Sequence, residues 1–140
     1  MNWAGLPRFR GGGTDEAVEF AGTGQVTEGV ICHVYRFAGD DSRDLGIIEV
    51  SPGCGTPVQR VAGGDETAEG WLAGAGTLTV ITAAGTVTEH GYPGAGPGPV
   101  VVSRGDSMFW EAGPAGLVFY EICAPPYAPG RFAGLFRQHL

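Results

Sequence analysis

The acidic residue Glu69 lies two positions before Trp71 in a short apolar segment. Residues two apart in a β-strand point to the same face, so the carboxyl group and the indole ring would be neighbours there. A carboxyl group beside an indole in an apolar interior loses solvation, which raises its pKa and suits it to general acid or base catalysis. The alternatives are a solvated carboxylate at a rim, or one paired with Arg60.

Two more residues are candidates for proton transfer. Glu66 carries the same chemical group, although it follows Gly63-Gly64-Asp65 and could equally belong to a loop. His33 is of the residue type that titrates near neutral pH, so it could act as a base or be a hydrogen-bonded structural residue. Four aromatic residues could line a pocket for a flat or apolar ligand, or could each pack in the core: Trp71, Trp110, Tyr35 and Tyr120.

The charge balance argues against two classes of partner. The chain has 8 basic residues, all of them Arg, against 15 Asp and Glu residues, for a formal net charge of −7. So acidic a protein offers little to neutralise phosphates, and we expect neither nucleic-acid binding nor attachment to an anionic membrane surface. No segment approaches the roughly 18 consecutive apolar residues of a membrane span.

The cysteines indicate a reducing compartment. Cys32, Cys54 and Cys123 are odd in number, and their spacing matches no zinc-binding pattern. Residues 1–13 contain no apolar stretch typical of a secretion signal. We therefore expect free thiols and a cytoplasmic protein.

Short apolar runs separated by glycine and proline dominate the chain, which contains 26 Gly and 10 Pro. About ten such runs, at the spacing typical of sandwiches and barrels, predict an all-β domain over residues 15–128. Residues 1–14 show no periodicity and are predicted to form an irregular N-terminal arm. Phe132, Leu135 and Phe136 follow one another at helical spacing, which predicts a short C-terminal helix within residues 129–140.

Two segments together resemble the two signature motifs of the cupin superfamily. The first runs from Gly55 to Thr77 and contains Gly74 and Gly76 at the positions of the motif's strand and turn. The second runs from Gly105 to Gly116 and contains Gly105-Asp106 and Gly113. The resemblance covers Glu49–Pro125, slightly over half of the chain. It implies a single jelly-roll β-barrel with a central pocket.

The metal-binding residues of this superfamily are not matched. The first two ligand histidines fall on Gln59 and Val61, and the last histidine falls on Gly116. The carboxylate ligand falls on Thr67, Glu66 or Glu69, depending on where the count begins. Because a divalent metal needs about three protein ligands, the resemblance implies a cupin without a metal, and we expect no cofactor.

The ligand positions of the superfamily point into the barrel, so strand alternation extends them to other residues. On this basis Gln59, Glu69 and Trp71 are expected to face the pocket. Tyr120 is expected to face it from the last strand, with Glu121 pointing outward.

The resemblance and the candidate residues together favour an enzyme of small-molecule, secondary-metabolite biosynthesis that needs neither metal nor cofactor. Cyclisation or isomerisation by acid/base catalysis and pocket shape is expected, with Pictet–Spengler and Diels–Alder ring closures as examples. The alternative is a non-catalytic ligand-binding or sensor cupin. A buried carboxyl group with shifted titration favours the enzyme, whereas a fully apolar pocket favours the binding protein. Small cupins often dimerise through their N-terminal strands, so a homodimer is expected.

Overall fold

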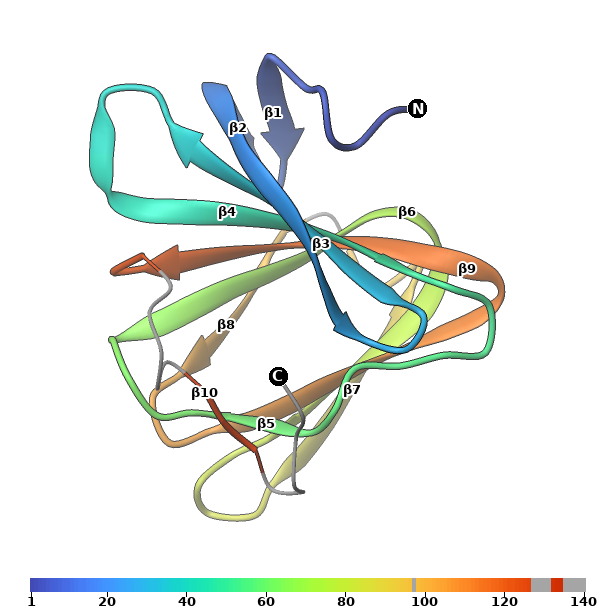
Figure 1. The fold of residues 1–140 in the computed structure, drawn as a ribbon. Coiled ribbons are helices and arrows are strands. Elements are labelled where there is room, and N and C mark those ends of the chain that lie inside the picture. The colour runs from blue at the N-terminus through green and yellow to red at the C-terminus, as the bar shows by residue number, and fades with distance from the viewer. Residues whose placement is uncertain (97, 127–131, 135–140) are drawn as a thin grey trace.

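The computed structural model describes residues 1–96, 98–126 and 132–134. All regular elements in this part of the chain are β-strands, as Figure 1 shows. The ten strands are β1 (Arg8–Gly11), β2 (Thr14–Thr27), β3 (Val30–Phe37), β4 (Asp40–Val50), β5 (Gln59–Val61), β6 (Glu66–Ile81), β7 (Val87–Tyr92), β8 (Val100–Ser103), β9 (Ser107–Ala124) and β10 (Phe132–Gly134).

The two long strands β6 and β9 are antiparallel partners and belong to both layers of the barrel. The second half of β9 pairs with β4, and the first half of β6 pairs with β8. These strands continue through β3 and β2 to β1 and form the first layer. The second layer contains the first half of β9, which pairs with β5, and the second half of β6, which pairs with β7. The short strand β10 also belongs to this layer. Figure 1 shows β6 and β9 running side by side between the two layers.

Glycines allow both long strands to bend at the same place. The β6–β9 register shifts between Trp71 and Ala73 and again between Gly74 and Gly76. Gly74 has a φ of 75°, and a Cβ atom there would lie 2.2 Å from the carbonyl oxygen of Gly116, which itself has a φ of 79°. Side chains are disfavoured at both positions, so the bend that closes the barrel depends on this pair.

The first layer is buried on both of its faces. The inner cluster lies between the two layers and includes Val30, Ile48, Val50, Leu78, Trp110 and Phe119. The outer cluster lies on the opposite face of the first layer and consists of Phe9, Val18, Tyr35, Phe37, Leu45, Ile47 and Tyr120, with Trp3 and Leu6 packed against it. The sequence neighbours Ile47 and Ile48 belong to different clusters, as expected for alternation along β4.

The predicted N-terminal arm is wrong in part, because residues 8–11 form β1. Arg8 to Gly11 pair with Thr14 to Ala17, and the side chain of Phe9 is buried in the outer cluster. The glycines after Phe9 suggested an irregular segment, whereas Gly12 and Gly13, both with positive φ, form the turn of a hairpin.

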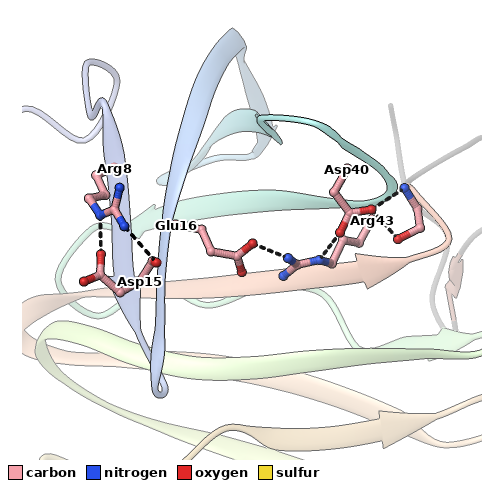
Figure 2. A network of polar contacts seen from close by, with 6 residues as sticks. Arg8, Asp15, Glu16, Asp40 and Arg43 are labelled. Carbon is pink, nitrogen blue, oxygen red and sulfur yellow. Dashed lines mark hydrogen bonds and ion pairs between the residues drawn. The ribbon is translucent and has the colours of Figure 1, made fainter.

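Ion pairs lie within this hairpin and between it and β4. Arg8 pairs with Asp15 across the hairpin, and Arg43 bridges Glu16 and Asp40, as Figure 2 shows. The Ser42 hydroxyl, then the Arg43 guanidinium and the Ser42 amide, lower the pKa of Asp40 to about 2.

The predicted C-terminal helix is contradicted where the structure describes that segment, since Phe132–Gly134 form β10, which pairs with β5. The other residues of 129–140 lie outside the described part of the chain. Among the described residues, no helix is long and apolar enough to cross a membrane.

Candidate functional site

A cavity of about 380 Å³ lies inside the barrel, against the inner cluster. Its volume is at the lower end of the range found for small-molecule sites. Most of its wall is apolar, and the polar groups on it are few. The lining residues come from β2 to β6 and β9 and from the segment before β5: Gln25, Val26, Val30, Cys32, Val34, Asp44, Leu45, Gly46, Ile48, Thr56, Gln59, Glu69, Met108, Trp110, Phe119, Glu121 and Cys123.

Glu69 on β6 is fully buried in this wall. Its Oε1 atom accepts a hydrogen bond of 2.9 Å from the indole Nε1 of Trp110. Its Oε2 atom has no hydrogen-bond partner among the described residues. A buried carboxyl oxygen with no partner is costly for a folded protein, which distinguishes Glu69 from the other polar residues of the wall.

The indole that holds Glu69 is itself fixed in place. The ring of Trp110 stacks on Phe119 at a centroid distance of 4.4 Å and an interplanar angle of 12°. The ring of Tyr92 lies 5.6 Å away. The backbone amide of Trp110 donates to the Thr56 hydroxyl over 2.9 Å. The orientation of Glu69 is therefore set by a rigid aromatic group.

A second carboxyl group, that of Glu121, faces Glu69. The two residues are direct cross-strand partners on β6 and β9, and both line the cavity. Burial, and then the negative charge of Glu121, raise the pKa of Glu69 well above its usual range, while the Trp110 hydrogen bond opposes that rise. Glu69 therefore holds its proton at pH values where an ordinary glutamate has lost it.

Burial and nearby carboxyl groups also affect a thiol in the wall of the cavity. Burial, followed by the charges of Glu121, Asp44 and Glu69, raises the pKa of Cys32 to about 12. The thiol of Cys123 donates to Glu121 over 3.2 Å. These thiols therefore lie in an acidic environment, which does not favour the thiolate that a cysteine nucleophile requires.

The structure brings three of the predicted site residues together: Gln59, Glu69 and Trp110. Gln59 lies on β5 and reaches the cavity beside its cross-strand partner Met108. The sequence offered Trp110 as a residue that could line a pocket. The structure adds that its indole donates a hydrogen bond to Glu69.

His33 lies apart from the cavity, because its side chain points to the opposite face of β3 from Cys32. Its Nε2 atom lies 2.6 Å from the Glu49 carboxylate, and its Nδ1 atom lies 2.8 Å from the Thr23 hydroxyl. The imidazole is buried, with both ring nitrogens partnered. This arrangement matches the structural alternative for His33 rather than a base for the cavity.

Tyr35 and Tyr120 also lie outside the cavity. Tyr35 follows the alternative of packing in the core, whereas the inward face expected for Tyr120 is wrong. Both belong to the outer cluster. The Tyr35 hydroxyl donates to the carbonyl oxygen of Trp3 and accepts from the amide of Leu6. The ring of Tyr120 packs edge-on against Phe9. The side chains on β9 are reversed relative to our expectation, and Glu121 rather than Tyr120 faces the cavity.

Trp71 and Glu66 do not line the cavity either. The Trp71 indole packs against the inner cluster and donates to the carbonyl oxygen of Gly74 over 3.1 Å, inside the bend of β6. Glu66 is exposed at the start of β6. The raised pKa of Glu69 therefore comes from burial and Glu121 and not, as the sequence suggested, from Trp71.

Sequence analysis missed Glu121 and Asp44 as cavity residues. Glu121 is the one charged residue in the apolar segment Leu117–Cys123. A charge in the middle of such a strand is a signal that could have identified it. Asp44 and Glu121 lie on neighbouring strands, with Asp44 opposite Cys123, two residues from Glu121.

The positions that the cupin resemblance assigns to metal ligands do not fit a transition metal. Gln59 offers an amide, Val61 is apolar and fully buried, and Gly116 has no side chain. Thr67, at one of the carboxylate positions, has a buried hydroxyl without a hydrogen-bond partner among the described residues. No cluster of three or more His, Cys, Asp or Glu residues suited to a metal occurs in this part of the chain. One amide, with one hydroxyl from Thr67 or one carboxylate from Glu66 or Glu69, is not the donor set that such metals require.

Comparison with models of protein families and with curated protein sequences gives no match. Solved structures do match. Bacillus subtilis oxalate decarboxylase, in a study of its Mn(II) centres, aligns with a TM-score of 0.63 and 17% identity over 78% of this chain and 29% of that chain. CapF, solved with the inhibitor 3-isopropenyl-tropolone, aligns with a TM-score of 0.66 and 12% identity over 86% of this chain and 34% of that one.

The chain thus spans about a third of the length of these proteins. At such identities the similarity shows the fold alone, and the predicted jelly-roll β-barrel is confirmed.

Proposed function

We propose that the cavity is the active site of an enzyme that performs acid/base chemistry on a small, largely apolar organic molecule, using side chains instead of a metal. The observation that carries this proposal is the Oε2 atom of Glu69, buried, unpartnered and opposite Glu121. Cyclisation or isomerisation is the reaction class that such a pair serves. Pictet–Spengler and Diels–Alder ring closures remain examples of it.

The two carboxyl groups are suited to opposite roles. Glu69 is fully buried and keeps its proton, so it acts as the general acid through Oε2. Glu121 is partly exposed and takes a proton from another atom of the substrate. An isomerisation then moves one proton from Glu69 into the substrate and one from the substrate to Glu121. A proton passes back from Glu121 to the facing Glu69 before the next turnover, which restores the enzyme.

The apolar wall contributes in two ways. It excludes water, which strengthens the interaction between the carboxyl groups and the bound molecule. It also holds a flexible substrate in a folded conformation, which lowers the entropic cost of a ring closure. A buried carboxyl group with shifted titration favours this function over the binding or sensor protein considered from the sequence.

Elimination of 5-nitrobenzisoxazole tests the proposal, because this small neutral probe opens when a base removes one proton from carbon, and an apolar environment speeds that step. The probe needs a base and no acid, so at high pH its rate reports on Glu69: once Glu69 has lost its own proton, its raised pKa makes it the stronger base of the two carboxylates. We expect the rate to rise with pH through an inflection well above the usual glutamate pKa of 4.5. Glu69→Gln should lower the rate by about 10²–10⁴-fold.

Glu89→Gln is the matched control, since Glu89 is exposed on β7 and does not line the cavity. It should leave the rate and its pH profile unchanged. Binding of the neutral fluorescent probe N-phenyl-1-naphthylamine checks that the cavity is intact in each variant. A cavity that binds this probe, with no elimination rate dependent on Glu69, would contradict the enzyme and support the binding protein.

A further inference from the structure

The hydrogen bond from Trp110 determines which oxygen of the Glu69 carboxyl group carries the proton. Glu69 is fully buried, and burial is the main reason that it stays a neutral acid. The indole Nε1 can only donate, and it donates to Oε1 over 2.9 Å. In a neutral carboxyl group the oxygen without the proton accepts such a bond. The proton of Glu69 therefore lies on Oε2.

The Oε2 atom is consequently a hydrogen-bond donor. It is buried and has no hydrogen-bond partner among the described residues. A protonated carboxyl group has one O–H to donate, and a buried donor that is left unmet costs free energy. The ligand atom that meets Oε2 is therefore an acceptor.

Glu121 competes with the ligand for this proton. It lies directly opposite Glu69 on β9, and in the proposed turnover it returns a proton to Glu69. A ligand that enters the site has to replace Glu121 as the acceptor. An oxygen with a lone pair does so, whereas an ammonium group has no lone pair to offer. The facing carboxyl group thus leads to the same requirement for the ligand.

The other polar side chains of the wall favour a neutral acceptor. Thr56 and Gln59 line the cavity on the side where Trp110 lies. The Thr56 hydroxyl accepts a bond from the backbone amide of Trp110, so its own proton is directed to another acceptor. No Lys, Arg or His is found among the described residues that line the cavity. A carboxylate or phosphate would therefore meet no cationic partner there.

The remainder of the wall suits an apolar body. Val30 and Ile48 line it, together with the stacked rings of Trp110 and Phe119. These surfaces favour an aliphatic or aromatic group attached to the acceptor.

We propose that the substrate is a neutral carbonyl compound, whose oxygen accepts a hydrogen bond from Oε2 of Glu69 and whose apolar or aromatic body lies against Trp110 and Phe119. This inference rests on the proposed function, since it names the substrate class of the same cavity. It goes further, because acid/base chemistry alone does not specify which group of the substrate meets the acid.

A carbonyl group gives both carboxyl groups a use. Glu121 takes a proton from the carbon next to the carbonyl group, and the electron pair of that C–H bond forms a C=C bond. The π electrons of the C=O bond move to the oxygen, which takes the proton of Glu69. The product is the enol, an isomer of the substrate. A donor already placed at the oxygen stabilises the negative charge that develops there.

The ketone 4-phenyl-2-butanone, labelled with ¹³C at its carbonyl carbon, tests the inference at pH 6. Calorimetry measures its dissociation constant, and infrared spectroscopy measures the frequency of the bound C=O stretch. A hydrogen bond to the oxygen weakens the C=O bond. In the wild type the band should therefore lie at lower frequency than it does for the same ketone in hexane.

Two variants of Glu69 distinguish a donor from other roles. In Glu69→Gln the amide oxygen accepts from Trp110, so the amide N–H takes the place of Oε2–H. This variant should bind the ketone within about fivefold of the wild type and keep a smaller band shift. Glu69→Leu offers no donor. It should bind the ketone about 5- to 100-fold more weakly, with the band near its position in hexane.

The exposed residue Glu89 again supplies the control. Glu89→Gln should leave the affinity and the band unchanged, because Glu89 does not line the cavity. Binding of N-phenyl-1-naphthylamine checks that the cavity is intact in each variant.

A wild-type band at the frequency found in hexane overturns the inference, as does a wild type that does not bind the ketone. Equal affinity and frequency in the wild type and Glu69→Leu overturn it as well. Weaker binding by Glu69→Gln than by Glu69→Leu would show that Oε2 does not act as a donor.

The proposed function is tested separately, because the elimination of 5-nitrobenzisoxazole requires a base and Glu69→Gln has none at this position. An unshifted ketone band together with a Glu69-dependent elimination rate rejects the carbonyl substrate alone. A shifted band that depends on Glu69, without that elimination rate, rejects the enzyme alone.

Discussion

The barrel interior and the outer face of the first layer each contain a buried titratable side chain, and the two differ in how completely it is bonded. Glu69 inside the barrel has one bonded and one unpartnered oxygen. His33 on the outer face has a partner at each ring nitrogen. A fully bonded group is fixed by the protein, whereas an incompletely bonded one beside a cavity is available to a ligand. This difference favours a chemical role for Glu69 and a structural role for His33.

The largest expected effect concerns the interior, at the Cys32 thiol. With a pKa of about 12, its thiolate fraction at pH 8 is about 10³-fold below that of an ordinary cysteine. We expect iodoacetamide to alkylate Cys32 about 10³-fold more slowly in the folded protein than in denaturant, where all three thiols should react. Peptide mass spectrometry over time measures the rate. Fast alkylation of folded Cys32 would remove the contrast between a dry, acidic interior and the outer face.

The second prediction concerns stability and pH. The folded protein keeps the Glu69 proton above the usual pKa of 4.5, so the wild type loses stability as pH rises from that value to the raised pKa. The loss is about 1.4 kcal/mol per pH unit over that range, and Glu69→Gln does not undergo it. Urea unfolding at several pH values should show that the variant becomes more stable relative to the wild type as pH rises above about 4.5. Below that pH, the difference in the free energy of unfolding should be constant.

The other titratable groups around Glu69 are Glu121, Asp44, Cys32 and Tyr120. They are present in both proteins. Because Glu121 interacts directly with Glu69, the difference reports the titration of this pair of carboxyl groups. A stability difference that does not change with pH would show that Glu69 titrates normally. The contrast between the barrel interior and the outer face of the first layer would then be lost.

The third prediction concerns the outer face. His33→Ala removes the contacts to Thr23 and Glu49, and we expect the free energy of unfolding to fall by about 1–2 kcal/mol. The elimination rate at 25 °C should stay within about twofold of the wild type, because His33 does not line the cavity. Urea unfolding and the rate of 5-nitrobenzisoxazole elimination measure the two effects. A folded His33→Ala protein without activity would reverse the roles assigned to the two regions.

The smallest effect is expected at the ion pairs of Figure 2. Arg43 bridges Glu16 and Asp40 at a partly exposed position and lies 3.9 Å above the centre of the Phe37 ring. Arg43→Ala should lower the free energy of unfolding by less than about 1 kcal/mol. Half or more of that loss should disappear in 1 M NaCl, since salt screens exposed pairs. A larger, salt-independent loss would show that the guanidinium matters mainly through packing.

The sequence by itself determined the fold class and one of the two facing carboxyl groups, that of Glu69. The resemblance of Gly74, Gly105-Asp106 and Gly113 to the cupin motifs implied the barrel. Gly74 and Gly105 have positive φ, which restricts the residue type at those two positions. The predicted register placed Glu69 in the wall of the barrel, where the structure has it. Gln59, which was expected to face the pocket, lines the cavity, and so does Trp110, for which the sequence left core packing as an alternative.

Only the tertiary structure decided which face of β3 and β9 points into the cavity. Alternation along a strand shows which residues share a face, but it does not show which face is the interior. The first layer is covered on both sides, by the inner cluster and by the outer cluster, so Tyr35 and Tyr120 are as deeply buried as the residues of the cavity wall. The bends of β6 and β9 at Gly74 and Gly116 shift the register within single strands. Hydrophobicity therefore could not distinguish the two faces, and Glu121 became a cavity residue only through the packing of β1 and the N-terminal residues on the other side.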